Sequence, residues 1–263
     1  MVATHSEHTR APVSLPAEAA FEAPPVVRVP PLASLPRARL RAMLMAGAEV
    51  LECYRVLKKG GLNLVGEVLR GQETFVEYQH YPAEDVFDPD TRAQYYYHAH
   101  RPGEHGHFHT FIRLAGPDNG SASDPAYRKG ADHASPQDVV HLIGISMDDY
   151  GWPIGLFATN HWVCGGTWRS AQEVIALLPR FQIDHAYPSW PVNHWISAMF
   201  ILFRPRIEAL LRHRDQMIAN WARAHPGADV LEDRNLEITG YLPISVEEMV
   251  SEVRTLASTR KAG

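Results

Sequence analysis

The chain has 263 residues, of which 45% are hydrophobic and 10% aromatic, a composition that supplies a large core and excludes a globally disordered or collagen-like chain. The formal net charge is −5, so no broad cationic surface is expected for nucleic acid or anionic lipid. The two cysteines, Cys53 and Cys164, lack CxxC spacing, which excludes a disulfide framework and a zinc site built on thiolates and suits a reducing compartment.

Neither a signal peptide nor a membrane span is expected. The first residues lack the charged start, apolar stretch and cleavage site of a signal peptide, and the longest apolar run, 196–203, is less than half of the roughly 20 residues that a span needs. We therefore expect a soluble, cytoplasmic protein with no membrane or nucleic-acid partner. Residues 1–35 contain six prolines among small residues and predict a disordered Pro/Ala-rich arm, a candidate segment for binding a protein partner.

Several elements are expected in the first half of the domain. From residue 36 to residue 59, apolar residues recur at three- and four-residue spacing and are followed by two glycines, which predicts an amphipathic helix. The alternating stretch 74–81 predicts a strand, and the acidic, turn-rich stretch 82–91 predicts a loop. Two further strands flank the turn at residues 101–106.

The next segment is expected to be a long loop followed by a second hairpin. Residues 115–137 are rich in Gly, Asp, Ser and Pro and predict a surface loop. The stretches 139–147 and 154–162 predict two strands that are joined by the turn sequence DDYGWP.

The C-terminal half is predicted to be mainly helical. Ser170 and Ser245 are each followed three residues later by a glutamate, the capping pattern that begins a helix. Residues 191–224 predict one long helix that Pro205 kinks. The simplest assembly is a single α+β domain over residues 36–260, with an antiparallel sheet of about five strands, helices packed on one face and a long C-terminal helix.

The most informative segment is the stretch QYYYHAHRPGEHGHFHTF, in which five of the 15 histidines fall within twelve residues. Alternate residues of a strand share a face, so a hairpin closed around residues 101–106 places four imidazoles on one face. We expect His100 opposite His107 and His98 opposite His109. The reverse face is then a core surface, formed by Tyr95, Tyr97, Ala99, Phe108 and Ile112.

This hairpin alone can supply a metal site. Opposed strand residues have Cβ atoms about 4.5–5.5 Å apart, so their imidazole nitrogens can converge on one ion with bonds of roughly 2.0–2.1 Å. Glu104 is a candidate fifth ligand or acid/base group, and His105 beside it is a second candidate catalytic residue. A solvated sheet face with polar residues outside is the alternative interpretation. The candidate metal ligands are His98, His100, His107 and His109.

Three family patterns touch this segment. His98-Ala-His100, with Glu104 after three intervening residues, resembles the first metal motif of cupins, which implies a catalytic metal held by these residues inside a β-barrel. The sequence from His105 through His107 to His109 is similar to the histidine-triad motif of nucleotide hydrolases and transferases, which implies that His107 attacks a phosphate. The whole block also resembles an uncharacterised bacterial domain family, a resemblance that implies no activity.

Other residues are candidates for supporting the site. The second predicted hairpin brings His141 and His161 near each other, where they can complete or support the metal site. Arg101 and Arg113 flank the histidines and are candidates for holding an anionic substrate through paired donors. Tyr96 shares the histidine face and is a candidate for lining a substrate pocket.

These observations favour a metal-dependent enzyme. An all-imidazole set suits iron, copper or zinc, and we prefer an oxidoreductase that uses iron or copper on a small molecule, because Glu104 is the single carboxylate that offers itself as a hydrolytic base. One alternative is a non-catalytic metal-binding or protein-interaction module. Another is histidine-triad-like phosphoryl or nucleotidyl chemistry through His107. No GxSxG, P-loop, GxGxxG or HExxH motif is present.

Overall fold

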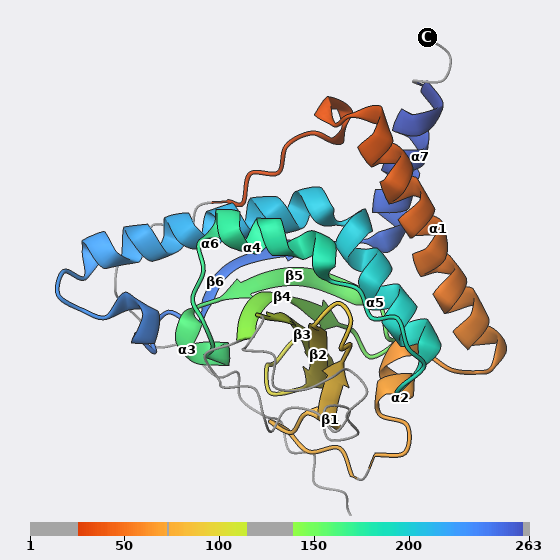
Figure 1. Ribbon diagram of the computed structural model, residues 1–263, viewed down its shortest axis with the longest axis horizontal. Coiled ribbons are helices and arrows are strands. Elements are labelled where there is room, and N and C mark those ends of the chain that lie inside the picture. The colour runs from red at the N-terminus through yellow and green to blue at the C-terminus, as the bar shows by residue number, and fades with distance from the viewer. Residues whose placement is uncertain (1–25, 73, 115–138, 260–263) are drawn as a thin grey trace, which may run out of the picture.

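The computed structural model describes residues 26–72, 74–114 and 139–259, so the surface loop expected at 115–137 lies outside the described residues. Six antiparallel strands form one sheet in the order of the chain, from β1 to β6 (Figure 1). The sheet has β1 and β6 as its two edges, so the described residues do not form the barrel that the cupin resemblance implies. The strands are β1 Tyr81–Phe87, β2 Ala93–His98, β3 Gly106–Arg113, β4 Val139–Met147, β5 Pro153–Thr159 and β6 Ile238–Pro243.

The larger helices pack on one side of this sheet, which confirms the α+β architecture, while the short helix that carries Cys164 lies toward the other side, beside His109. The helices are α1 Arg37–Lys59, α2 Leu64–Val68, α3 His161–Cys164, α4 Ala171–Leu177, α5 Trp190–Leu202, α6 Arg204–Ala224 and α7 Val246–Thr259. Helix α6 lies against β5 and β6, while α1 packs between α5 and α7 at the outside of the molecule (Figure 1). Helix α5 reaches the sheet through Trp195, whose ring centroid is 5.5 Å from that of Phe108.

The core surface expected on the reverse face of the histidine hairpin is confirmed. Tyr95, Tyr97, Phe108 and Ile112 are fully buried members of the main hydrophobic core. The Tyr95 hydroxyl donates a hydrogen bond of 2.6 Å to Asn193 Oδ1 on α5, and the Tyr97 hydroxyl is hydrogen-bonded to His105, so both buried hydroxyls of this core face are satisfied. Because side chains alternate along a strand, the histidines of β2 and β3 point to the opposite side of the sheet.

The first strand lies later in the chain than expected. Of the alternating stretch 74–81, residues 74–80 are largely exposed and form no strand, and only Tyr81 belongs to β1, which otherwise occupies the stretch expected to be a loop. Strand β1 is an edge strand with a bulge between Tyr81 and Val86, and Pro82 and the acidic residues are tolerated there because an edge strand exposes one row of backbone groups. Strand β6 is additional to the five strands expected.

Most expected helix boundaries are confirmed. Helix α1 ends at Lys59 before Gly60, and Ser170 forms the predicted capping box with Glu173 at the start of α4. The single helix expected at 191–224 is instead two helices, α5 and α6, whose axes run in clearly different directions (Figure 1). The break lies at Phe203 because Pro205 cannot donate a helical hydrogen bond and its ring blocks the preceding turn.

Glycine allows a close approach of two outer helices. A Cβ atom at Gly47 on α1 would lie 2.8 Å from a methyl group of Val250 on α7, which explains why the smallest residue stands in the apolar stripe of α1.

The last part of the expected N-terminal arm packs on the domain. Of residues 1–35, only 26–35 belong to the described residues. There Val27 and Leu32 are buried in the core, and Leu32–Ser34 forms a 3-10 helix. Within the described ranges, no helix is long and apolar enough to cross a membrane.

Candidate metal centre

The histidine hairpin closes in a different register from the one expected. His98 faces His107, and Tyr96 faces His109, so the predicted pairs of His100 with His107 and His98 with His109 are wrong by two residues. The turn between β2 and β3 is therefore longer than expected. After the turn, the chain first pairs with β4, where the His105 amide donates a hydrogen bond of 2.9 Å to the Met147 carbonyl. A shift of two residues keeps every side chain on its face, so the predicted sharing of one face survives.

Three imidazoles converge at the turn end of this hairpin. His98, His100 and His107, which we call the histidine trio, each offer a ring nitrogen, and these nitrogens lie within 4.8 Å of one another. The ring centroids of His98 and His107 are 4.4 Å apart, and the rings are nearly perpendicular. His98 is 9% exposed and His107 is 1% exposed. Their Nε2 atoms are buried and have no hydrogen-bond partner among the described residues.

A carboxylate determines which nitrogen of His107 is free. Glu104 is hydrogen-bonded to His107 Nδ1, and its two oxygens also accept hydrogen bonds of 3.0 and 3.1 Å from Arg101. Since a neutral imidazole donates from one nitrogen only, donation from Nδ1 to the carboxylate leaves a bare lone pair on Nε2. This arrangement is the one found in carboxylate–histidine–metal sites.

The surroundings of the trio favour neutral imidazoles. Burial, reinforced by neighbouring imidazoles, lowers the pKa of His98 to about 2. Burial also lowers the pKa of His107 to about 4, against the opposing effect of Glu104. Burial alone would raise the pKa of Glu104, but the His107 hydrogen bond and the charge of Arg101 outweigh it and lower that pKa. The site therefore combines neutral nitrogen donors with one ionised carboxylate.

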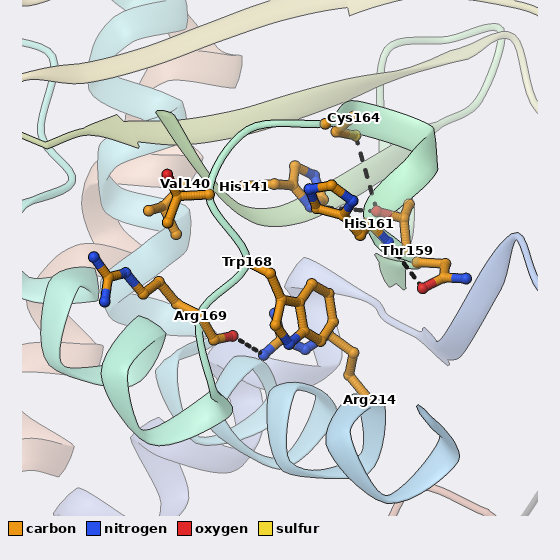
Figure 2. A pocket seen from close by; sticks show the side chains of 11 residues that line it. Val140, His141, Thr159, His161, Cys164, Trp168, Arg169 and Arg214 are labelled. Carbon is orange, nitrogen blue, oxygen red and sulfur yellow. Dashed lines mark hydrogen bonds between the residues drawn. The ribbon is translucent and has the colours of Figure 1, made fainter. Parts of the chain in front are cut away.

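The fourth predicted ligand belongs to a neighbouring cluster. His109 lies beside His141 of β4 and Cys164 of α3, and the ligand atoms of these three residues, which we call the thiol cluster, also lie within 4.8 Å of one another. The His109 ring is 4.9 Å from that of His107 between centroids, so the trio and the thiol cluster adjoin on one face of the sheet. His141 and Cys164 also line a small pocket at the edge of this face (Figure 2).

Aromatic rings enclose the histidines. Tyr96 lies 5.2 Å from His98 and 5.3 Å from His109 between ring centroids, and its other side is stacked against His80 at 3.5 Å. Phe157 of β5 contacts the edges of His107 and His109. Tyr96 is therefore placed on the histidine face as expected, while His80 and Phe157 were not singled out from the sequence.

Three other candidate residues contact groups outside the histidine trio. His105 is hydrogen-bonded to the Tyr97 hydroxyl at 2.6 Å, and Tyr97 belongs to the core face. Arg113 donates to Gln94 Oε1 at 2.7 Å and lies over the Phe87 ring. His161 is the first residue of α3 rather than part of a strand, because the Asn160 side chain caps that helix, and its ring is hydrogen-bonded to Glu232.

Cys164 is the main ligand-type residue that the sequence interpretation missed. It lies 55 positions after His109, and its side chain reaches His109 because the chain returns to β3 after β5, at α3. No local spacing links the two residues, so the contact depends on tertiary structure.

The comparisons with known proteins identify a family without an assigned activity. The model of a family described as a domain of unknown function, DUF6969, matches residues 44–244, a range that contains both clusters. No curated protein and no solved structure matches the chain. The match confirms the resemblance to an uncharacterised family, and the chain belongs to the DUF6969 domain family.

Proposed function

We propose that this protein is a metal-dependent enzyme whose ion is bound by His98, His100 and His107. The observation that carries the proposal is the pair of buried Nε2 atoms on His98 and His107, which have no hydrogen-bond partner among the described residues. Leaving a buried polar atom unpaired costs about 1–3 kcal/mol. A bound ion would satisfy both nitrogens together with that of His100.

The spacing of the trio suits one ion. Three atoms that lie within 4.8 Å of one another have a common centre no more than about 2.8 Å from each. Bonds of roughly 2.0–2.1 Å then require each nitrogen to move inward by less than about 1 Å, which small ring rotations supply.

The proposed role of Glu104 is to orient His107. Both carboxylate oxygens accept hydrogen bonds from Arg101, and one is also bonded to His107. These contacts lower the pKa of Glu104, which makes it a weaker base for taking a proton from water. This engagement favours redox chemistry over hydrolysis, and hence iron or copper over zinc. When bound, such a metal would supply electron transfer to or from a small-molecule substrate.

The half-buried side of the trio is the proposed approach for that substrate. His100 is the trio member with intermediate exposure, and its ring is stacked at 5.0 Å against Tyr78, which is 71% exposed. The Arg101 guanidinium lies 4.0 Å from the centre of the Phe157 ring at the same end of the hairpin. A planar, anionic small molecule fits a rim that offers an aromatic face and a cation.

Metal content tests this function. We expect purified wild-type protein to contain iron or copper by elemental mass spectrometry, with an electron paramagnetic resonance signal from the oxidised ion. His98→Gln and His107→Gln should lower the affinity of the trio at least tenfold, whereas the control His161→Gln, which changes an imidazole bound to Glu232, should not. Equal affinity in all three variants would overturn the proposed site. Zinc in the wild-type trio, without a redox signal, would overturn the oxidoreductase assignment alone.

A further inference from the structure

We propose that His109, His141 and Cys164 form a second metal site, for a thiophilic ion such as Zn²⁺ or Cu⁺, beside the histidine trio. The ligands of this site are distinct from those of the trio, so the inference goes beyond the proposed function and does not depend on it. Sulfur and imidazole together select softer ions than imidazole alone. The second site is therefore expected to differ from the first in metal preference.

The ligand atoms already have the spacing of a coordination shell. His109 Nδ1 lies 3.0 Å from His141 Nε2 and 3.4 Å from Cys164 Sγ. Around a tetrahedral ion with bonds of about 2.05 Å to nitrogen and 2.3 Å to sulfur, these separations would be about 3.3 and 3.6 Å. These two separations are thus within a few tenths of an ångström of the tetrahedral values, and the third pair, His141 with Cys164, has its ligand atoms within 4.8 Å of each other. The three residues come from β3, β4 and α3, so packing of three separate elements fixes this geometry.

A hydroxyl group orients the second imidazole. Thr159 Oγ1 lies 3.4 Å from His141 Nδ1 and 3.8 Å from Cys164 Sγ, and Figure 2 shows the dashed contact between Thr159 and Cys164. When Nδ1 of His141 is the protonated nitrogen and donates to this hydroxyl, Nε2 presents its lone pair toward His109 and Cys164. A hydrogen bond from the outer nitrogen of a metal-bound histidine is the usual arrangement in protein metal sites.

Without an ion, the cluster is held by weak or shared hydrogen bonds. The thiol is a weak hydrogen-bond donor, and two neutral imidazole nitrogens that face each other share a single proton. The contacts of Cys164 Sγ with His109 Nδ1 at 3.4 Å and with Thr159 Oγ1 at 3.8 Å are accordingly long. Upon binding, the thiol would release its proton to solvent as the sulfur–metal bond forms.

The pocket provides access and a place for a fourth ligand. His141, Thr159 and Cys164 line one wall of the pocket in Figure 2, and Trp168 and Arg214 lie on the other side. Arg214 is held by Asp215 and lies over the Trp168 ring, so its charge is partly neutralised before an ion arrives. A water molecule entering from the pocket can complete a tetrahedral shell.

Cobalt titration of the metal-free protein, with a non-thiol reductant present, tests the second site. We expect wild-type protein to bind Co²⁺ with a near-ultraviolet thiolate-to-cobalt charge-transfer band and a total of two ions per chain. Cys164→Ser should abolish the band and lower the stoichiometry to one. The matched control is Cys53→Ser, because Cys53 is the other cysteine of the chain and is buried in α1; it should leave both the band and the stoichiometry unchanged.

Two further variants separate this inference from the proposed function. His141→Gln keeps the thiol, and its circular dichroism spectrum should match that of the wild type. In this variant the Co²⁺ affinity measured from the charge-transfer band should fall at least tenfold. The double variant His98→Gln/His107→Gln should keep the band with one ion per chain. A wild-type protein that binds one Co²⁺ without the band would overturn the second site and leave the trio intact. A band that persists in Cys164→Ser, or one that disappears from a correctly folded double variant, would also overturn the second site. Loss of a single ion from the double variant, with the band retained, concerns the trio alone.

Discussion

The free nitrogen of each imidazole decides what the histidine face can bind. Glu104 holds His107 Nδ1, so Nε2 remains available, and the same logic applies to His141, whose Nδ1 faces Thr159. These two supporting contacts are provided by residues close to the ligands in space, but only Glu104 is close in sequence. The chemistry of the face therefore depends on polar groups that are not themselves ligands.

Removing the carboxylate should weaken the first site without destroying it. Glu104→Gln retains size and polarity but loses the charge that orients His107, so we expect metal affinity at the trio to fall about 10–100-fold. Competition with a chromogenic chelator measures the change. The matched control is Glu232→Gln, which alters the carboxylate beside His161, outside the trio. Equal affinities in wild-type protein and Glu104→Gln would contradict the proposed role of Glu104.

The metal-free protein should be acid-labile. His98 and His107 have pKa values of about 2 and 4 in the folded chain, whereas an unfolded histidine titrates near 6.5. Below pH 6.5 the unfolded chain therefore binds protons that the folded chain does not, and the free energy of unfolding should fall by about 2 kcal/mol for each imidazole by pH 5. Urea unfolding in the presence of a chelator at pH 7 and pH 5 measures this, and His98→Gln/His107→Gln should show a shallower loss. A wild-type stability that does not change over this range would contradict the burial of neutral imidazoles.

At the scale of strands, two glycines allow aromatic rings from the neighbouring strand to lie directly over them. A Cβ atom at Gly144 would lie 2.0 Å from the Phe157 ring, and one at Gly155 would lie 2.0 Å from the Tyr241 hydroxyl. Phe157 also contacts His107 and His109. The glycine on β4 thus determines where a ring on β5 lies, and that ring in turn supports the two imidazoles.

Filling the space at Gly144 should disturb both stability and the metal site. We expect Gly144→Ala to lower the free energy of unfolding by about 1–3 kcal/mol, because the Phe157 ring must move, and to reduce metal affinity at the trio. In a Phe157→Ala background, which removes the ring, the added cost of Gly144→Ala should largely vanish. Thermal denaturation of the four proteins in this cycle measures the coupling. Additive effects would show that Gly144 does not act through Phe157.

Sequence patterns predicted the elements with a strong local signal. Helix α1, the Ser170–Glu173 capping box and strand β4 have the expected limits, because apolar periodicity and capping are properties of neighbouring residues. The register of the histidine hairpin was missed because it depends on where the chain joins β4, a tertiary contact. Strand β1 was missed because pairing at a sheet edge overrides the turn-like composition of its sequence.

At the scale of the whole molecule, the sheet separates two functions. One face is covered by helices and supplies the core, while the other carries the trio, the thiol cluster and their aromatic surroundings. The ligand types and shared face of His98, His100, His107 and His109 were predictable from the period of a strand. Their division into two clusters was not, because His141 and Cys164 come from other parts of the fold.

Ion binding should stabilise the whole domain. The trio joins β2, the following turn and β3, and these residues come together only in the folded chain. At a metal concentration one hundred times the Kd, the free energy of unfolding should rise by about 2.7 kcal/mol. Thermal melting of metal-free protein with and without the ion measures this, and His98→Gln/His107→Gln should show less of the shift. An equal shift in that variant would place the stabilising ion elsewhere.

Anomalous diffraction from crystals of the metal-loaded protein, recorded at the absorption edge of the bound ion, tests the central claim most directly. The account predicts an anomalous peak bonded to His98 Nε2, His107 Nε2 and a ring nitrogen of His100, with bonds of roughly 2.0–2.1 Å. A loaded crystal whose anomalous peaks all lie away from these three imidazoles, with both Nε2 atoms still unpaired, would contradict it.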